Sequence, residues 1–427
     1  MRNRWFHPPK LHSPSPGNAR RVGWLELFYD LIYVAAIVQL GNGLAHHVGL
    51  IGFLAFAGLF VPIWSTWTSF TFYSNRFVVD DFVHRAVVFA QMFGVAAMAV
   101  SVPEVFEGRP VPFAISYAFV RLTIVGLYLR TYLQTPEGRR MTRRNLLGFG
   151  GSALLWLAAI FVAAPWVYLL WGVALVIDFG VPLNRQSRAV TMEFPPDAMH
   201  ISERYGLLTI IVLGESFVKV LSEVAASGLT PTLGAMGALA LLVTFSLWWI
   251  YFDDVAGSRI KRGTLTPFVW VYAHLPLTLG VTAVGVAVKK AALMAPLDPG
   301  AGKSRWLLCG SLALTLFAVG VLDAVTERRH ANVSDRPRFL VRLSSAVLVL
   351  LLAPTGRFMP AWAFVAIIAL VCVAQVVLDL FLAPMTDPDE AHHEHQQLFA
   401  DRRRPAPEPA PAAESPDPAR PPRLRNP

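Results

Sequence analysis

Charged residues are scarce in this sequence, and cysteine is nearly absent. Asp, Glu, Lys and Arg make up only 15% of the 427 residues, whereas 55% are hydrophobic and the mean hydropathy is +0.49. The two cysteines, Cys309 and Cys372, both lie inside apolar runs, which excludes a disulfide framework and a cysteine metal site. Long apolar runs recur along the whole chain, and this pattern predicts an all-α polytopic membrane protein.

The sequence also lacks the motifs that many enzymes and nucleotide-driven pumps carry. It has no pair of histidine-rich ligand segments and no nucleophile motif at a helix end. The segment GAGKS (300–304) resembles the end of a phosphate-binding loop, but Leu297 stands where that motif needs glycine. We therefore expect no enzyme activity and no cofactor, and we expect any transport to be secondary or passive.

The apolar runs predict about twelve transmembrane helices. An apolar run of about 18 residues or more is long enough to cross a bilayer as a helix. The segments at 146–163 and 166–183 are separated by a very short connection, so we expect them to form a tight helical hairpin, with one re-entrant unit as the alternative. The predicted spans are 24–45, 52–74, 84–102, 112–133, 146–163, 166–183, 201–223, 232–253, 267–289, 305–326, 338–354 and 360–383.

Positive charge falls in alternate loops, as it does in multi-pass proteins of the cell membrane. Clusters such as Arg139–Arg144 and Arg259–Arg262 alternate with loops that hold few basic residues. By the positive-inside rule, both termini are expected to be cytoplasmic. One predicted outer loop, which holds Lys289 and Lys303, has the opposite charge pattern. The formal net charge of +9 thus reflects membrane topology, and we expect no nucleic-acid partner.

The two halves of the chain resemble each other. LELFYDLIYVAAIVQLGN opens the first predicted span and SERYGLLTIIVLGES opens the seventh, which aligns Glu26 with Glu203. VIDFGVPL and VLDLFLAP close the two halves and align Asp178 with Asp379. Because six spans is an even number, the halves would be parallel six-helix repeats. The predicted organisation is a basic cytoplasmic tail (1–22), two repeats (23–185 and 186–384) and a disordered cytoplasmic tail (385–427).

Two carboxylates stand at the head of the first predicted span. Glu26 and Asp30 are four residues apart, so they lie on one face of a helix. An ionisable residue inside a membrane costs a few kcal/mol, about 2.5–3.5 for Asp or Arg at the helix centre, and usually marks a functional site. The alternative is structural, because acidic residues at a helix N-terminus are favoured by the helix dipole, and Arg20 and Arg21 are close in sequence.

Further ionisable residues lie inside other predicted spans. HISERYGLLTIIVLGESFVKVL places Glu215 and Lys219 one helical turn apart, either as a structural ion pair or as part of a binding site. Arg121 lies near the middle of the fourth span and needs a partner, for which Glu215 and Asp178 are the candidates. The candidate substrate- or ion-binding residues are Glu26, Asp30, Glu203, Arg204, Glu215, Lys219, Arg121 and Asp178.

Two blocks of this sequence together resemble the bacterial low temperature requirement A (LtrA) family. Its members share an opening similar to LELFYDLIYVAAIVQL and a second block similar to HISERYGLLTIIVLGES. Residues that match the second block are His200, Glu203, Arg204, Gly206, Gly214, Glu215 and Ser216. The resemblance covers about residues 20–385 and implies a multi-spanning membrane protein. The family name refers to growth in the cold and implies no particular substrate.

These observations predict a secondary transporter of an ion or small solute with a central acidic pathway. The expected partners are membrane lipids and an ion or small solute, and the sequence leaves open whether the chain forms a homo-oligomer. A cation channel is the first alternative, because a weaker similarity links the sequence to bacterial relatives of the lysosomal potassium channel. However, this sequence lacks the Arg-x-x-x-Phe-Ser-Asp spacing of those channels. A membrane scaffold in cold or stress adaptation, without transport activity, is the second alternative.

Overall fold

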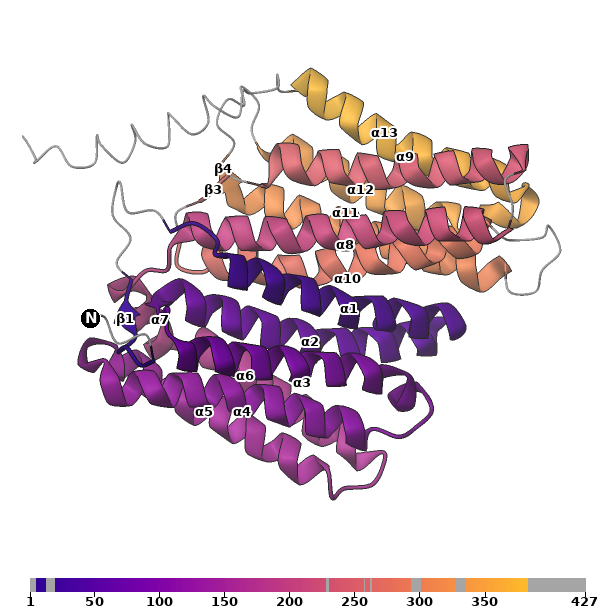
Figure 1. Cartoon of the computed structure of the whole chain (residues 1–427). Coiled ribbons are helices and arrows are strands. Elements are labelled where there is room, and N and C mark those ends of the chain that lie inside the picture. Colours follow the sequence, from indigo (N-terminus) through magenta and orange to yellow (C-terminus); the bar gives the residue numbers. More distant parts are fainter. Residues whose placement is uncertain are drawn as a thin grey trace, which may run out of the picture. The chain divides into compact units, whose positions relative to one another are not determined.

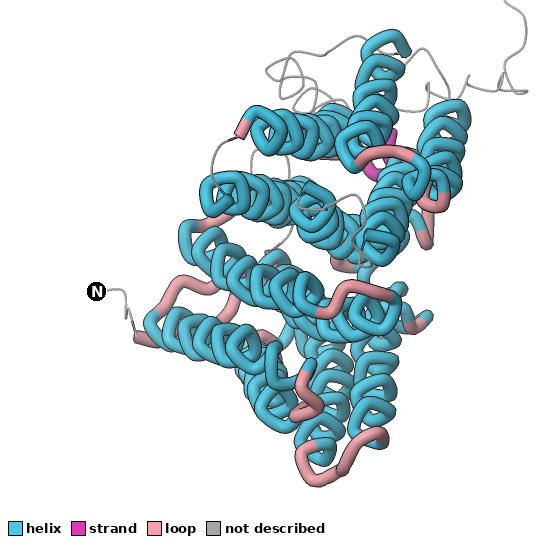
Figure 2. Tube along the Cα trace, turned by 90° about the vertical axis from the view of Figure 1, so that its right-hand side faces the viewer, coloured by secondary structure: helices cyan, strands magenta, loops and turns pink. Residues whose placement is uncertain are grey.

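The computed structural model describes residues 5–12, 20–227, 230–256, 258–261, 263–292, 301–327 and 335–382. In this part of the chain almost every residue belongs to a helix (Figure 2). The first half contains α1 (Trp24–His46), α2 (Leu50–Arg76), α3 (Phe82–Phe106), α4 (Val111–Gln134), α5 (Arg139–Ala159), α6 (Trp166–Leu183) and the short α7 (Arg185–Glu193). The second half contains α8 (Ala198–Ser227), α9 (Pro231–Asp254), α10 (Thr266–Ala292), α11 (Ala301–Val325), α12 (Asp335–Leu352) and α13 (Ala361–Leu382).

The described residues contain nine helices that are long and apolar enough to cross a membrane. They are α1, α2, α3, α4, α6, α9, α10, α11 and α13. The other three long helices, α5, α8 and α12, coincide with predicted spans but each contains four or more charged residues. The chain is therefore all-helical with multiple candidate spans, and the full set of twelve spans stays a prediction.

The helices run up and down through the bundle (Figure 1). Helices α1, α3, α5, α8, α10 and α12 begin at the end where the arginine-rich loops lie, and we call it the basic end. Helix α5 begins at Arg139, seven residues before the predicted start, because the helix includes the arginine cluster that the hydropathy pattern left out. Helices α5 and α6 pack against each other as the expected hairpin.

Two small strand pairs close the basic end. β1 (Lys10–Leu11) pairs with β2 (Phe77–Val78), which follows α2, and β3 (Arg259–Ile260), which follows α9, pairs with β4 (Thr326–Glu327). The first pair attaches residues 5–12 of the predicted N-terminal tail to the helices. Residues 13–19 of that tail and the whole predicted tail 385–427 lie outside the described part of the chain.

The first five long helices of the two halves show the same pattern of neighbours. In the first half α1 packs on α2 and α3, and contacts then follow from α3 to α4 and α4 to α5. In the second half α8 packs on α9 and α10, and contacts follow from α10 to α11 and α11 to α12. The last helices differ, because α6 packs mainly on α5 whereas α13 packs mainly on α9. The halves meet where α1 and α2 contact α8 and α10. The candidate site lies at this junction.

Candidate functional site

The site begins with the first turn of α1. Gly23 is the N-cap, and its backbone N–H donates to Glu26 Oε2 at 2.9 Å, so the carboxylate satisfies a helix-terminal donor. Arg20 Nη2 donates to Glu26 Oε1 at 2.9 Å. Arg20 lies outside the helix, and burial lowers the pKa of its guanidinium while the charge of Glu26 opposes that change. The expected charged helix entrance is therefore present.

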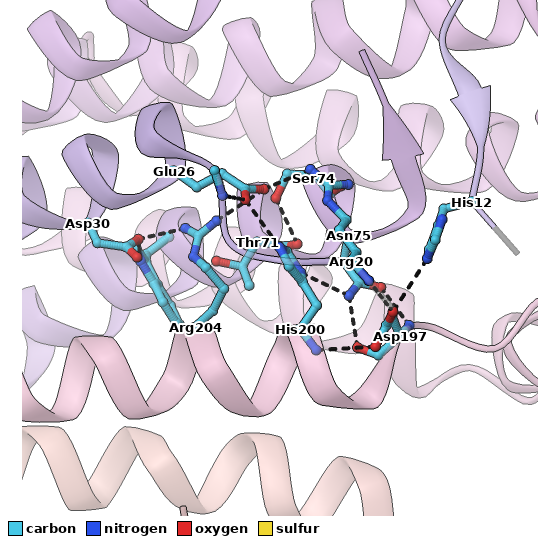
Figure 3. A network of polar contacts seen from close by, with 12 residues as sticks. His12, Arg20, Glu26, Asp30, Thr71, Ser74, Asn75, Asp197, His200 and Arg204 are labelled. Carbon is cyan, nitrogen blue, oxygen red and sulfur yellow. Dashed lines mark hydrogen bonds and ion pairs between the residues drawn. The ribbon is translucent and has the colours of Figure 1, made fainter. Parts of the chain in front are cut away.

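Helix α8 supplies the main partners of both α1 carboxylates (Figure 3). Arg204 Nη2 donates to Asp30 Oδ1 at 2.5 Å, and Arg204 Nη1 lies 3.5 Å from Glu26 Oε1. His200 Nε2 lies 3.1 Å from Glu26 Oε2. The side chains of Asp30, His200 and Arg204 are fully buried. These ion pairs join the first helix of one half to the first helix of the other.

Helix α2 holds this cluster from a third side. Trp67 Nε1 donates to Asp30 Oδ1 at 2.7 Å. The Asn75 amide lies 3.1 Å from His200 Nδ1, and it also exchanges two hydrogen bonds with the backbone of Asp197. We call Glu26, Asp30, Trp67, Asn75, His200 and Arg204 the α1–α8 cluster. The sequence pattern missed Trp67 and Asn75, because nothing on α2 shows which side chains face α1 and α8.

Asp197 caps α8 and links it to the N-terminal segment. Its Oδ1 accepts from the backbone N–H of Met199 and His200, at 3.1 and 3.2 Å. Its Oδ2 accepts from Arg20 N at 3.2 Å and lies 3.4 Å from His12 Nε2. The segment PPDAMH contains the signal for this cap, an aspartate directly before a helix, which the hydropathy pattern does not reveal.

A second buried ion pair lies within the first half. Arg121 of α4 donates through Nη2 to Asp178 Oδ2 of α6 at 2.6 Å, and both side chains are fully buried. Arg121 also donates to Ser65 and Ser69 of α2, at 2.7 and 2.8 Å. Tyr117 OH donates to Asp178 Oδ2 at 2.9 Å. Of the two candidate partners of Arg121, Asp178 is the one in contact.

Seven of the eight predicted site residues fall into three separate groups, and Glu203 lies apart from them. Glu26, Asp30 and Arg204 are in the α1–α8 cluster, and Arg121 pairs with Asp178. Glu215 and Lys219 form an intrahelical pair further along α8, with 3.6 Å between Oε1 and Nζ. Glu203 is exposed although it is adjacent to Arg204, because neighbouring residues point to different faces of a helix.

A cavity of about 900 Å³ opens at the basic end. It is lined by α2, α4, α5, α6, α7, α8, α10 and the loop that precedes α10. Lining residues such as Pro195 and Thr264 are exposed, whereas Ser65 and Asp178 are buried, so the cavity leads inward from the surface. Along α2 it extends from Arg76 to Trp64, about 18 Å at the rise of a helix. Of the eight predicted residues, Asp178 lines this cavity.

Among the described residues, no group of three or more His, Cys, Asp and Glu side chains is placed to hold a metal ion. The histidines of the C-terminal tail, His392, His393 and His395, lie outside the described residues. The candidate site is therefore a set of buried ion pairs beside a cavity.

Comparison with known proteins agrees with the resemblance seen in the two sequence blocks. The chain is similar to the uncharacterized protein RA0937 of Rhizobium meliloti (strain 1021), with 28% identity over 278 residues, which are 61% of this chain and 67% of that protein. The family model described as bacterial low temperature requirement A protein (LtrA) matches residues 21–377. That match includes every helix from α1 to α12 and most of α13. The chain belongs to the bacterial low temperature requirement A (LtrA) family.

Proposed function

We propose that this LtrA protein is a secondary transporter of a small solute in the cell membrane, and that the cavity at the basic end is its solute-binding chamber. The cavity carries the proposal. Its volume of about 900 Å³ suits a small molecule, and helices of both halves line it. It ends at the buried Arg121–Asp178 pair, a polar group in a position where an isolated charge would be costly.

The predicted repeat fits this function. Two parallel six-helix halves that rock against each other are a known way to expose a site to one side of a membrane at a time. The equivalent helix neighbours in the two halves support the repeat. Both termini would be cytoplasmic, so that the cavity faces the cytoplasm in this conformation.

The α1–α8 cluster would control the movement between the halves. Arg204 and His200 hold the two α1 carboxylates from the other half, so relative movement of α1 and α8 must break or exchange these contacts. A protonation change at Glu26 or Asp30 would weaken the cluster, which couples a proton to the movement. Glu215 and Lys219 lie deeper on α8, where they would complete the polar pathway.

Flux across liposomes tests this proposal. Purified protein is reconstituted and screened for uptake of inorganic ions and small organic solutes, with Asp178→Asn as the test variant and Arg85→Gln as the control. Arg85 is an exposed residue at the same end that pairs with Asp80 and does not line the cavity. Saturable uptake that Asp178→Asn abolishes and Arg85→Gln retains supports a carrier. Unitary currents would indicate a channel instead, and no flux of any solute would favour a scaffold.

A further inference from the structure

The lining of the cavity contains many more positive than negative side chains. Among the described residues, Arg76, Arg144, Arg188 and Lys261 line it, whereas Asp178 is the one acidic residue that does. Asp178 is itself paired with Arg121, so its charge is compensated. The lining of this chamber is therefore basic, and it is not the acidic pathway that the sequence pattern predicted. Neither Glu26 nor Asp30 lines the cavity.

Two buried donors in the lining have no acceptor among the described residues. Trp64 is 3% exposed and its Nε1 has no hydrogen-bond partner. Arg188 is half-buried as a residue, but its Nε atom is buried and also has no partner. A buried N–H without a partner destabilises the fold, so such groups usually meet an acceptor from a ligand or water. Donors of this kind, in a lining with excess positive charge, select a ligand that carries acceptor oxygens and negative charge.

The rest of the lining is strongly aromatic. Phe72, Tyr128, Phe149, Phe179, Phe268 and Tyr272 line the cavity together with Trp64. Aromatic and apolar walls with a few fixed polar groups are typical of sites that bind the apolar body of a small organic molecule. A bare inorganic anion would leave this surface unused.

We propose that the cavity binds an organic anion, with a carboxylate or phosphate held by the basic residues and an apolar body packed against the aromatic wall. This inference rests on the proposed function and names the class of solute. An anionic lipid headgroup has the same chemistry as a free organic anion, and the test below separates the two.

The test measures binding of 2-naphthoate to the full chain in nanodiscs of phosphatidylcholine by calorimetry. The neutral 2-naphthalenemethanol and the cationic 2-naphthylmethylammonium have the same ring and provide the comparison. We expect naphthoate to bind about tenfold or more tightly than either, because a charge-assisted hydrogen bond contributes about 1.5–3 kcal/mol. Equal binding of all three compounds, or tighter binding of the cation, would overturn the inference without any variant.

Variants locate the site. Arg188→Gln and Trp64→Phe should each weaken naphthoate binding, by about tenfold for Arg188→Gln, whereas Arg85→Gln should leave it unchanged. An equal loss in Arg188→Gln and Arg85→Gln would mean surface attraction and would refute a site in the cavity. Since the comparison of the three compounds uses wild-type protein, the inference stays testable if a variant does not fold.

Two further arms identify the source of the anion and separate this inference from the transport proposal. Nanodiscs that contain phosphatidylglycerol should suppress naphthoate binding if a lipid headgroup occupies the site, and should leave it intact if the ligand is a free anion. Naphthoate binding without flux of any anion would support the site and contradict transport. Saturable flux of a cation, without naphthoate binding, would support transport and overturn the anion site.

Discussion

Arg204 is the residue on which the α1–α8 cluster depends. It compensates Asp30 and Glu26 together, at 2.5 and 3.5 Å, and its side chain is fully buried. Arg204→Gln would leave the buried Asp30 without its counter-charge and would remove one of the two guanidinium groups near Glu26, the other being Arg20. Loss of one partner of a buried ion pair costs about 3–5 kcal/mol. We therefore expect a large fall in the thermal midpoint of the detergent-solubilised protein.

A double-mutant cycle provides the control for this prediction. Asp30→Asn removes the buried charge that Arg204→Gln leaves unpaired, so the double variant should be more stable than Arg204→Gln alone. Additive losses would contradict the claim that the two side chains act as a pair. Arg85→Gln, at an exposed ion pair, should change the midpoint very little, because such pairs contribute about 0–1 kcal/mol.

Asp81 lies outside the membrane spans, and its ionisation predicts how the stability of the fold depends on pH. Burial raises the pKa of Asp81, but hydrogen bonds from Arg130 and from the N–H groups of His7 and His84 outweigh it and lower the pKa from 3.8 to about 2. A lowered pKa means that the ionised form of Asp81 stabilises the fold. This stabilisation is complete above pH 3.8 and is lost as the pH falls through about 2. Asp81→Asn should thus cost about 2 kcal/mol near neutral pH.

The measurement for Asp81 is the thermal midpoint of wild type and Asp81→Asn over a pH series. The difference between them should be constant above about pH 5 and should shrink as the pH approaches 2. A constant difference at all pH values would contradict the assigned ionisation. Asp80→Asn is the matched control, since the Asp80 side chain is 75% exposed and pairs with Arg85 on the surface.

At the scale of the elements, the packing of α8 on α10 depends on a glycine. A Cβ at Gly285 would lie 2.5 Å from Ser216 Oγ and 3.0 Å from Ser216 Cα. Since part of this contact is backbone, Gly285→Ala must push the two helices apart, at a cost of about 1–3 kcal/mol. Gly310→Ala on α11 meets nothing within 4 Å and should be neutral. Equal thermal midpoints for the two variants would contradict this account.

The sequence predicted the helices well and the site only in part. Apolar length predicted the twelve long helices, but it missed the short polar helix α7 and the start of α5, which continues through charged residues. The spacing of Glu26 and Asp30 correctly placed them on one buried face. Their partners on α2 and the cavity depend on contacts between helices distant in sequence. No local periodicity encodes the fit of Trp67 against Asp30.

For the whole molecule, the orientation in the membrane gives a prediction that cysteine labelling can check. Both natural cysteines are fully buried, so introduced cysteines should label without background. Thr264 is exposed at the mouth of the cavity, and Glu107 is exposed in the loop at the opposite end. If the basic end faces the cytoplasm, a membrane-impermeant maleimide on intact cells should label Glu107→Cys and spare Thr264→Cys.

Inside-out vesicles should reverse that result, and they also allow the accessibility of the chamber to the maleimide to be measured. Phe72→Cys lies in the cavity wall and is half-buried, so the maleimide should reach it from the cytoplasmic face alone in this conformation. An organic anion in the chamber should slow that labelling, while Thr264→Cys at the rim should label at its usual rate. Labelling of Phe72→Cys from the outer face of intact cells, at the same rate as Glu107→Cys, would contradict a chamber that opens at the basic end.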